Sequence, residues 1–184
     1  MKKLYFIILS SILFLSSNTM SGQNINGIWL GDSETNAMFA VDDDETTSTQ
    51  IFISFSGGNT SVGMYLTYEE ANFGKIVIVF GLPGTYLKDG SHVNCTFRSS
   101  EFVINVSEYT VTDPELKALM DSNPDMKKYI LDEMVKKIQT EDPATIKLVK
   151  DFCNQFKNFT IVSATDSKLV LKVKGKTLSF DKAQ

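Results

Sequence analysis

The stretch Asn26-Gly27-Ile28-Trp29-Leu30-Gly31 opens the first segment of the chain that has the composition of a β-strand, and it carries the only tryptophan. A large aromatic residue in a strand, with a glycine on either side of Ile28-Trp29-Leu30, is typical of a packing anchor and not of a reactive centre. We therefore expect the folded part of the protein to begin here.

The residues before this stretch have the pattern of a secretory signal peptide. Lys2-Lys3 form a charged region, residues 4–15 are apolar residues and serines, and residues 16–22 are small or polar. The apolar region is shorter than the roughly 20 residues that a membrane span requires. We therefore expect removal of residues 1–22, a single domain over residues 23–184, and export to the periplasm or the extracellular space with no membrane span in the mature chain.

Length and charge narrow the possible partners. The chain has 184 residues, 42% of them hydrophobic, which suits one domain with a sizeable core. The formal net charge is -4, from 18 basic and 22 acidic residues. Arg98 is the only arginine, so the forked side chain that usually contacts phosphate and guanine is scarce. Nucleic acid is not expected as a partner.

Export also bears on the two cysteines, Cys95 and Cys153. In an oxidising compartment a cysteine pair forms a disulfide more often than a metal site. The alternative is two separate buried thiols, because a sequence does not specify the geometry that a disulfide needs. With His92 as the only histidine, a tetrahedral zinc site is not expected.

Residues 25–111 have a β-strand texture. Apolar and polar residues alternate, or apolar residues run continuously, over 51–55, 62–66, 76–80, 93–97 and 102–106. Turn residues separate these segments at short, regular intervals, which favours an antiparallel meander over βαβ units. The strand pattern returns over residues 159–180.

Between these two regions the sequence predicts helices. Asp113-Pro114, Asn123-Pro124 and Asp142-Pro143 each place a capping residue before a proline, as at the start of a helix. Apolar residues behind the second and third pairs recur with a helical period: Met126, Tyr129, Ile130, Met134 and Ile138, then Ile146, Val149, Phe152, Cys153 and Phe156. We predict a helical insertion of three segments over about 113–157.

The Gly27-Ile28-Trp29 motif, at the start of an exported meander that ends in a strand hairpin, resembles the Gly-any-Trp signature of the lipocalin-like (calycin) barrels. Residues 159–180 look like the last strands of small lipocalin-like proteins from bacteria. The resemblance implies that Trp29 closes one end of the barrel beneath a basic residue of a late strand. No arginine follows Arg98, so the candidates for that residue are Lys172, Lys174 and Lys176.

We therefore predict a mainly β (α+β) fold: an antiparallel up-and-down β-barrel with the helical insertion before the final hairpin, either covering the mouth or packing outside. The resemblance implies about eight strands around an interior cup for one small, mostly apolar ligand. The candidate cavity residues are Tyr65, Phe80, Tyr86 and Tyr109. The alternative is that these aromatic residues belong to the core.

No catalytic, metal or cofactor site is predicted. The region around His92 has no Gly-any-Ser-any-Gly elbow, and Asp42-Asp43-Asp44-Glu45 lacks the pattern of an EF-hand loop. The leading hypothesis is a non-catalytic exported protein that binds a small hydrophobic ligand inside the barrel. The competing hypothesis is a secreted interaction or inhibitory module that binds a protein partner through its outer surface and has a solid core.

Overall fold

The computed structural model describes residues 24–40, 47–71 and 74–183. The predicted signal peptide and the acidic turn at 42–45 lie outside these ranges. The strands are β1 (Gly27–Gly31), β2 (Thr47–Ser56), β3 (Asn59–Glu70), β4 (Gly74–Asp89), β5 (His92–Phe97), β6 (Val103–Thr110), β7 (Asn158–Ala164), β8 (Lys168–Val173) and β9 (Lys176–Lys182). The helices are α2 (Ser33–Ala37), the 3-10 turn η1 (Ser99–Glu101), α3 (Pro114–Ser122), α4 (Pro124–Glu141) and α5 (Pro143–Gln155).

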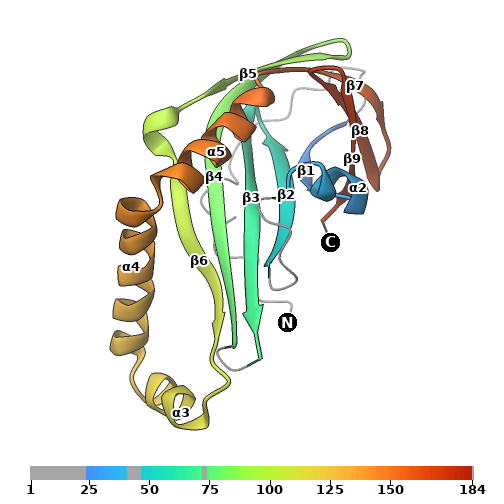
Figure 1. The fold of residues 1–184 in the computed structure, drawn as a ribbon. Coiled ribbons are helices and arrows are strands. Elements are labelled where there is room, and N and C mark those ends of the chain that lie inside the picture. The colour runs from blue at the N-terminus through green and yellow to red at the C-terminus, as the bar shows by residue number, and fades with distance from the viewer. Residues whose placement is uncertain (1–23, 41–46, 72–73, 184) are drawn as a thin grey trace.

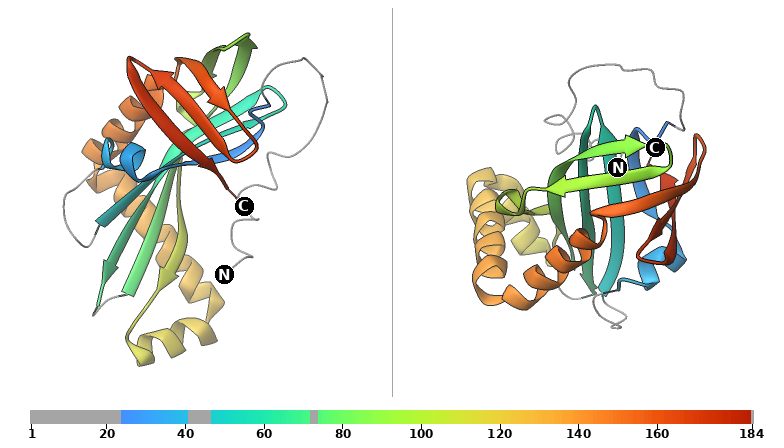
Figure 2. Two further views of the ribbon diagram at one scale, coloured as in Figure 1. Left: turned by 90° about the vertical axis from the view of Figure 1, so that its right-hand side faces the viewer. Right: turned by 90° about the horizontal axis from the view of Figure 1, so that it is seen from above.

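The strands close into a barrel with one strand left outside the ring. Antiparallel pairings join β1 to β2, β3, β4, β5, β7, β8, β9 and back to β1, which makes a closed ring of eight strands (Figures 1 and 2). The fold-class prediction is therefore confirmed. The ninth strand, β6, pairs with β4 over residues 75–81, whereas β5 pairs with the same edge of β4 over residues 84–89. β6 thus extends the sheet of β2, β3 and β4 beyond the ring.

Trp29 anchors the closure between the first and last strands. Its side chain is buried, its Nε1 donates a hydrogen bond to the Ile25 carbonyl oxygen at 2.7 Å, and it lies opposite Lys182 in the β1–β9 register. The Lys182 Nζ lies 5.3 Å from the centroid of the indole ring, a cation–π contact. Gly27, at φ +132°, leaves room for this lysine, because a β-carbon there would come within 2.9 Å of the Lys182 Cε.

The basic residue over the tryptophan was therefore predicted wrongly. It is Lys182, and not Lys172, Lys174 or Lys176. The reason is register: Lys174 lies in the turn between β8 and β9, and the end of β9 that pairs with β1 is the opposite end. Lys176 instead places its Nζ 5.1 Å from the centroid of the Phe39 ring.

The three predicted helices begin at the three Pro-containing pairs. The side chain of Asp113 accepts hydrogen bonds from the Glu115 and Leu116 amides, and Asn123 and Asp142 cap α4 and α5 in the same way. Each proline occupies the first turn, where no amide hydrogen is needed. α3 and α4 lie beside β6, outside the ring, whereas α5 returns across the sheet to the barrel (Figure 1).

One face of α5, together with Phe156 directly after it, packs into the barrel core. Phe152, Cys153 and Phe156 are buried, and the Cys153 Sγ donates to the Val62 carbonyl oxygen of β3 at 3.3 Å. The Phe156 ring lies 6.5 Å from the rings of both Phe159 and Phe180, centroid to centroid. The rest of the core is also large and apolar, and its fully buried members include Trp29, Phe55, Phe80, Ile51, Ile53, Met64, Leu66, Leu82, Leu169 and Leu171. The sequence left two possibilities for the barrel interior, a cup for a ligand and a solid core of side chains. The buried residues correspond to the solid core.

Truncation of Phe156 tests this role of α5. Phe156→Ala removes a fully buried ring that contacts two strands, so we expect it to lower the free energy of unfolding by roughly 3–5 kcal/mol. Leu148→Ala, on the exposed face of the same helix, is the control and should change stability by about 0.5 kcal/mol or less. Urea denaturation of both variants measures the difference. Equal stability of the two variants would contradict the insertion of α5 into the core.

Candidate functional site

The predicted disulfide is absent: Cys95 and Cys153 are both free and buried. The prediction of a Cys95–Cys153 bond is therefore wrong, and the alternative of two separate buried thiols holds. The geometry explains this, because the Cys153 Sγ points to the Val62 carbonyl on β3, while Cys95 lies on β5 opposite Tyr86 of β4. Burial raises the pKa of both thiols to about 12, so neither is a reactive thiolate at neutral pH.

These raised pKa values predict a loss of stability in alkaline solution. An unfolded thiol releases its proton near pH 8.5, whereas the folded thiols retain theirs until the pKa of about 12. The unfolded chain thus binds fewer protons across this window, so the stabilisation is complete below about pH 8.5 and is lost as pH rises toward 12. Urea denaturation from about pH 8 to pH 11 should show a shallower decline for Cys153→Ala than for the parent protein. Parallel declines would contradict the assignment.

The four aromatic residues proposed for the ligand cavity lie in different parts of the molecule. Phe80 is buried in the barrel core, and its ring lies 6.3 Å from that of Phe102. Tyr86 packs edge-on against Phe55 of the core, and burial raises its pKa. Tyr65 alternates with the inward-facing Met64 and Leu66, so it lies on the outer face of β3, where it contacts Phe52.

Tyr109 is the member of the four that lines a cavity found in the described part of the chain. This cavity has a volume of about 810 Å³ and lies between α3 and the part of the sheet that β6 extends. We call it the α3–β6 cleft. Its lining residues are Tyr68, Gly74, Lys75, Ile76, Tyr109, Thr110, Val111, Asp113, Glu115, Leu116, Leu119 and Met134.

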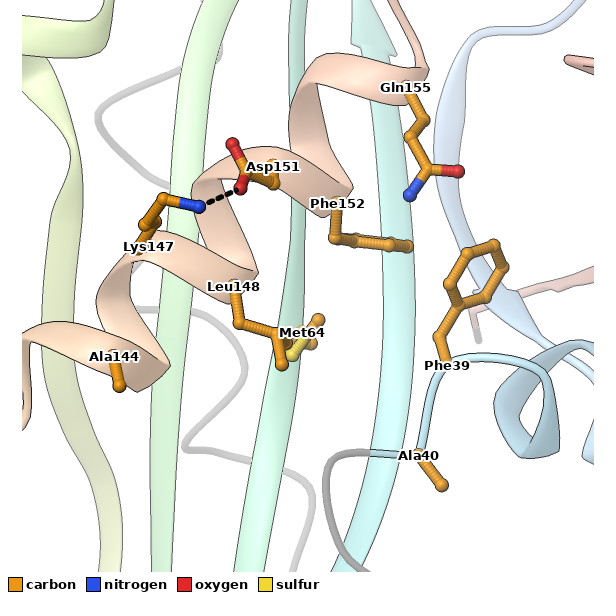
Figure 3. A pocket seen from close by; sticks show the side chains of 9 residues that line it. All are labelled: Phe39, Ala40, Met64, Ala144, Lys147, Leu148, Asp151, Phe152 and Gln155. Atoms are coloured by element: carbon orange, nitrogen blue, oxygen red, sulfur yellow. Dashed lines mark hydrogen bonds and ion pairs between the residues drawn. The ribbon is translucent and has the colours of Figure 1, made fainter.

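A second hollow, which we call the α5 depression, lies beside α5 and has a volume of about 560 Å³ (Figure 3). Its lining includes Phe39, Met64 and Phe152, and an ion pair between the Lys147 Nζ and the Asp151 carboxylate at 2.9 Å lies at its edge. Met64 and Phe152 are buried in the core, so solvent and ligands do not reach them. The apolar floor of the α5 depression therefore belongs to the core, and Leu148 is the one residue of its lining among the exposed large hydrophobic residues of the described chain.

The apolar side chains that line the α3–β6 cleft are more accessible to solvent than those of the α5 depression. Tyr68, Leu116 and Leu119 keep 37%, 39% and 51% of their surface exposed. Isolated exposed leucines are common on protein surfaces, but several around one concave site are typical of a ligand-binding cleft. On the criterion of accessible apolar surface, the α3–β6 cleft is the better candidate site.

Local structure explains why the cleft forms where β6 ends. Gly74 opens β4 at φ +105° and lies so close to the Thr110 carbonyl of β6 that a β-carbon would clash with it. The chain can therefore leave β6 through Val111 and start α3 directly at the Asp113 cap. Met120 is the buried residue of α3, so Leu116 and Leu119 remain at the cleft.

Two of the charged groups that line the cleft, Lys75 and Asp113, have partners within the protein. The Lys75 Nζ forms an ion pair with the Glu108 carboxylate at 3.1 Å, with both side chains partly exposed. The Asp113 carboxylate accepts from the amides of Glu115 and Leu116 at 2.9 and 2.8 Å. In the described part of the chain no cluster of three or more His, Cys, Asp or Glu residues could hold a metal ion. His92 lies on β5, exposed and away from the cleft.

The sequence analysis did not predict the α3–β6 cleft, and Tyr109 is the one lining residue that it named as a cavity residue. A signal was present, because Leu116 and Leu119 follow the Asp113 cap with the spacing of one helix face. The sequence does not show that this face turns toward the free end of β4 and β6, since that depends on β6 leaving the ring.

The closed barrel, with Trp29 beneath Lys182, is compatible with a calycin-like fold. No protein-family model matches the chain, and no curated protein sequence matches it. Within residues 24–40, 47–71 and 74–183, no helix is long and apolar enough to cross a membrane.

Proposed function

We propose that this is an exported, non-catalytic binding protein that holds a small, mostly apolar ligand in the α3–β6 cleft and not in the barrel interior. The observation that carries the proposal is the contrast between the two places. The interior is filled by core side chains and α5, whereas the cleft of about 810 Å³ exposes apolar side chains to solvent. That volume is within the range of about 300–1,000 Å³ that is usual for small-molecule sites.

The composition of the lining supports binding of an elongated or amphipathic molecule. Ile76, Leu116 and Leu119 offer apolar contact from β4 and α3, and Met134 adds an adaptable side chain from α4. Tyr68 and Tyr109 combine an aromatic ring with a hydroxyl group. Export is part of the proposal because of the signal-like residues 1–22.

A protein-binding module is the second candidate. Its support is that Tyr129 of α4, which is outside the cleft lining, keeps 65% of its surface exposed. A partner would cover this surface, and a small ligand would not.

The first test is mass spectrometry of the protein purified from its own host under native conditions. The proposal expects a polypeptide that begins near residue 23 and an additional mass that disappears on denaturation. A polypeptide that retains residues 1–22 would contradict export.

A binding experiment locates the ligand. We expect N-phenyl-1-naphthylamine, an uncharged fluorescent probe, to bind the mature protein, and Leu116→Gln to weaken binding by about fivefold, since partial loss of a leucine contact costs about 1 kcal/mol. Leu87→Gln is the matched control, because Leu87 is 78% exposed and far from the cleft lining. Equal affinity of the parent and Leu116→Gln proteins, or no binding of the probe, would contradict the cleft as the site.

A further inference from the structure

We infer that the α3–β6 cleft selects amphipathic cations, molecules with an apolar body and an ammonium-type head, over anions such as fatty acids. This inference rests on the proposed function, since it assigns the charge of the ligand to the same cleft. The inference depends on which charged groups of the cleft are already paired within the protein and which are available to pair with a ligand.

The cationic side chain of the cleft is already compensated. Lys75 is the basic residue of the lining, and a fatty-acid carboxylate would have to pair with it. Its Nζ lies 3.1 Å from the Glu108 carboxylate across the β4–β6 ladder. An anionic ligand would therefore have to displace Glu108 or approach two charges that sum to zero.

The N-terminus of α3 is the second feature that could attract an anion. Free amides and the helix dipole make such a terminus favourable for negative charge. Here the Asp113 carboxylate accepts from the Glu115 and Leu116 amides at 2.9 and 2.8 Å, and the Asp113 carbonyl accepts from the Lys117 amide at 2.9 Å. The terminus is thus occupied by the protein's own carboxylate.

Glu115 is the charge that remains. Its side chain lines the cleft and is exposed, and none of the ion pairs among the described residues includes it. Tyr68 and Tyr109 line the same cleft, and the face of an aromatic ring attracts a cation. A carboxylate beside two aromatic side chains and an apolar wall is the combination that suits an ammonium head on an apolar body.

The lysines of α4 do not reverse this balance. Met134 is the residue that α4 contributes to the cleft lining. The Lys128 Nζ pairs with Asp132 at 2.7 Å, the Lys136 Nζ with Glu133 at 3.2 Å and the Lys137 Nζ with Glu141 at 3.7 Å, so three of the four lysines of α4 are matched along their own helix. Lys127 of α4 and Lys117 of α3 are not part of the cleft lining. The lining contains one basic residue, Lys75, and two acidic residues, Asp113 and Glu115, so its acidic residues outnumber its basic ones.

The test compares three ligands with the same alkyl chain and different heads: decyltrimethylammonium, decanol and decanoate. The two charged ligands are kept below their micelle concentrations, and decanol is kept below its solubility limit. Affinities for the mature protein are measured by displacement of N-phenyl-1-naphthylamine. We expect decyltrimethylammonium to bind about fivefold more tightly than decanol, the effect of one exposed carboxylate, and decanoate to bind most weakly. The advantage of the cation should shrink as salt concentration rises, because exposed charges are screened.

Glu115→Gln should reduce the advantage of decyltrimethylammonium over decanol, since the affinity for the cation loses the contribution of the carboxylate. Glu34→Gln is the matched control, since it removes the same charge from an exposed position on α2. If decanol and decanoate bind as tightly as the cation and Glu115→Gln changes nothing, the inference is wrong although the cleft still binds ligands. If none of the three ligands binds, the proposed function fails as well.

Discussion

The packing of the buried face of α5 on the barrel core is the interaction on which the other features of this structure depend. Phe152, Cys153 and Phe156 occupy the space that a hollow barrel would offer to a ligand. These residues follow α3 and α4 in the sequence. Cys153 contacts Val62 of β3, and Phe156 contacts Phe159 of β7, so the end of the helical insertion is held against strands that precede and follow it in the sequence. Close-packed cores leave few voids larger than a water molecule, so the ligand site that we propose lies at the surface and not in the interior.

The α3–β6 cleft forms because the strands of the sheet differ in length. β4 has 16 residues, and β3 pairs with it over residues 74–85, but the other edge of β4 is shared between β5 and β6. The end of β4 near Gly74 and the end of β6 near Thr110 extend beyond the ring, where no strand of the described residues lies opposite them (Figure 1). α3 supplies a wall there, with leucines that the barrel core does not use.

Much of this architecture could be predicted from local sequence. Strand alternation, the capping residues before Pro114, Pro124 and Pro143, and the strand position of Trp29 are short-range signals, and they correspond to what the structure shows. Lys182 was missed because the choice among late lysines depends on the β1–β9 register, which joins the two ends of the chain. The state of Cys95 and Cys153 depends on where two side chains point inside a shared core. Long-range geometry of this kind leaves no local pattern.

Because β6 is outside the ring, the residues that close the barrel differ from the residues that line the α3–β6 cleft. Ring closure uses the β1–β9 and β5–β7 pairings together with α5, and none of these contributes to the lining of the α3–β6 cleft. We therefore expect that the exposed residues of 111–122, but not the buried Met120, can change in polarity while the barrel keeps its closure. A scaffold built in this way can be given a new specificity by exchange of one short helix, and the cost to folding would be that of a surface segment.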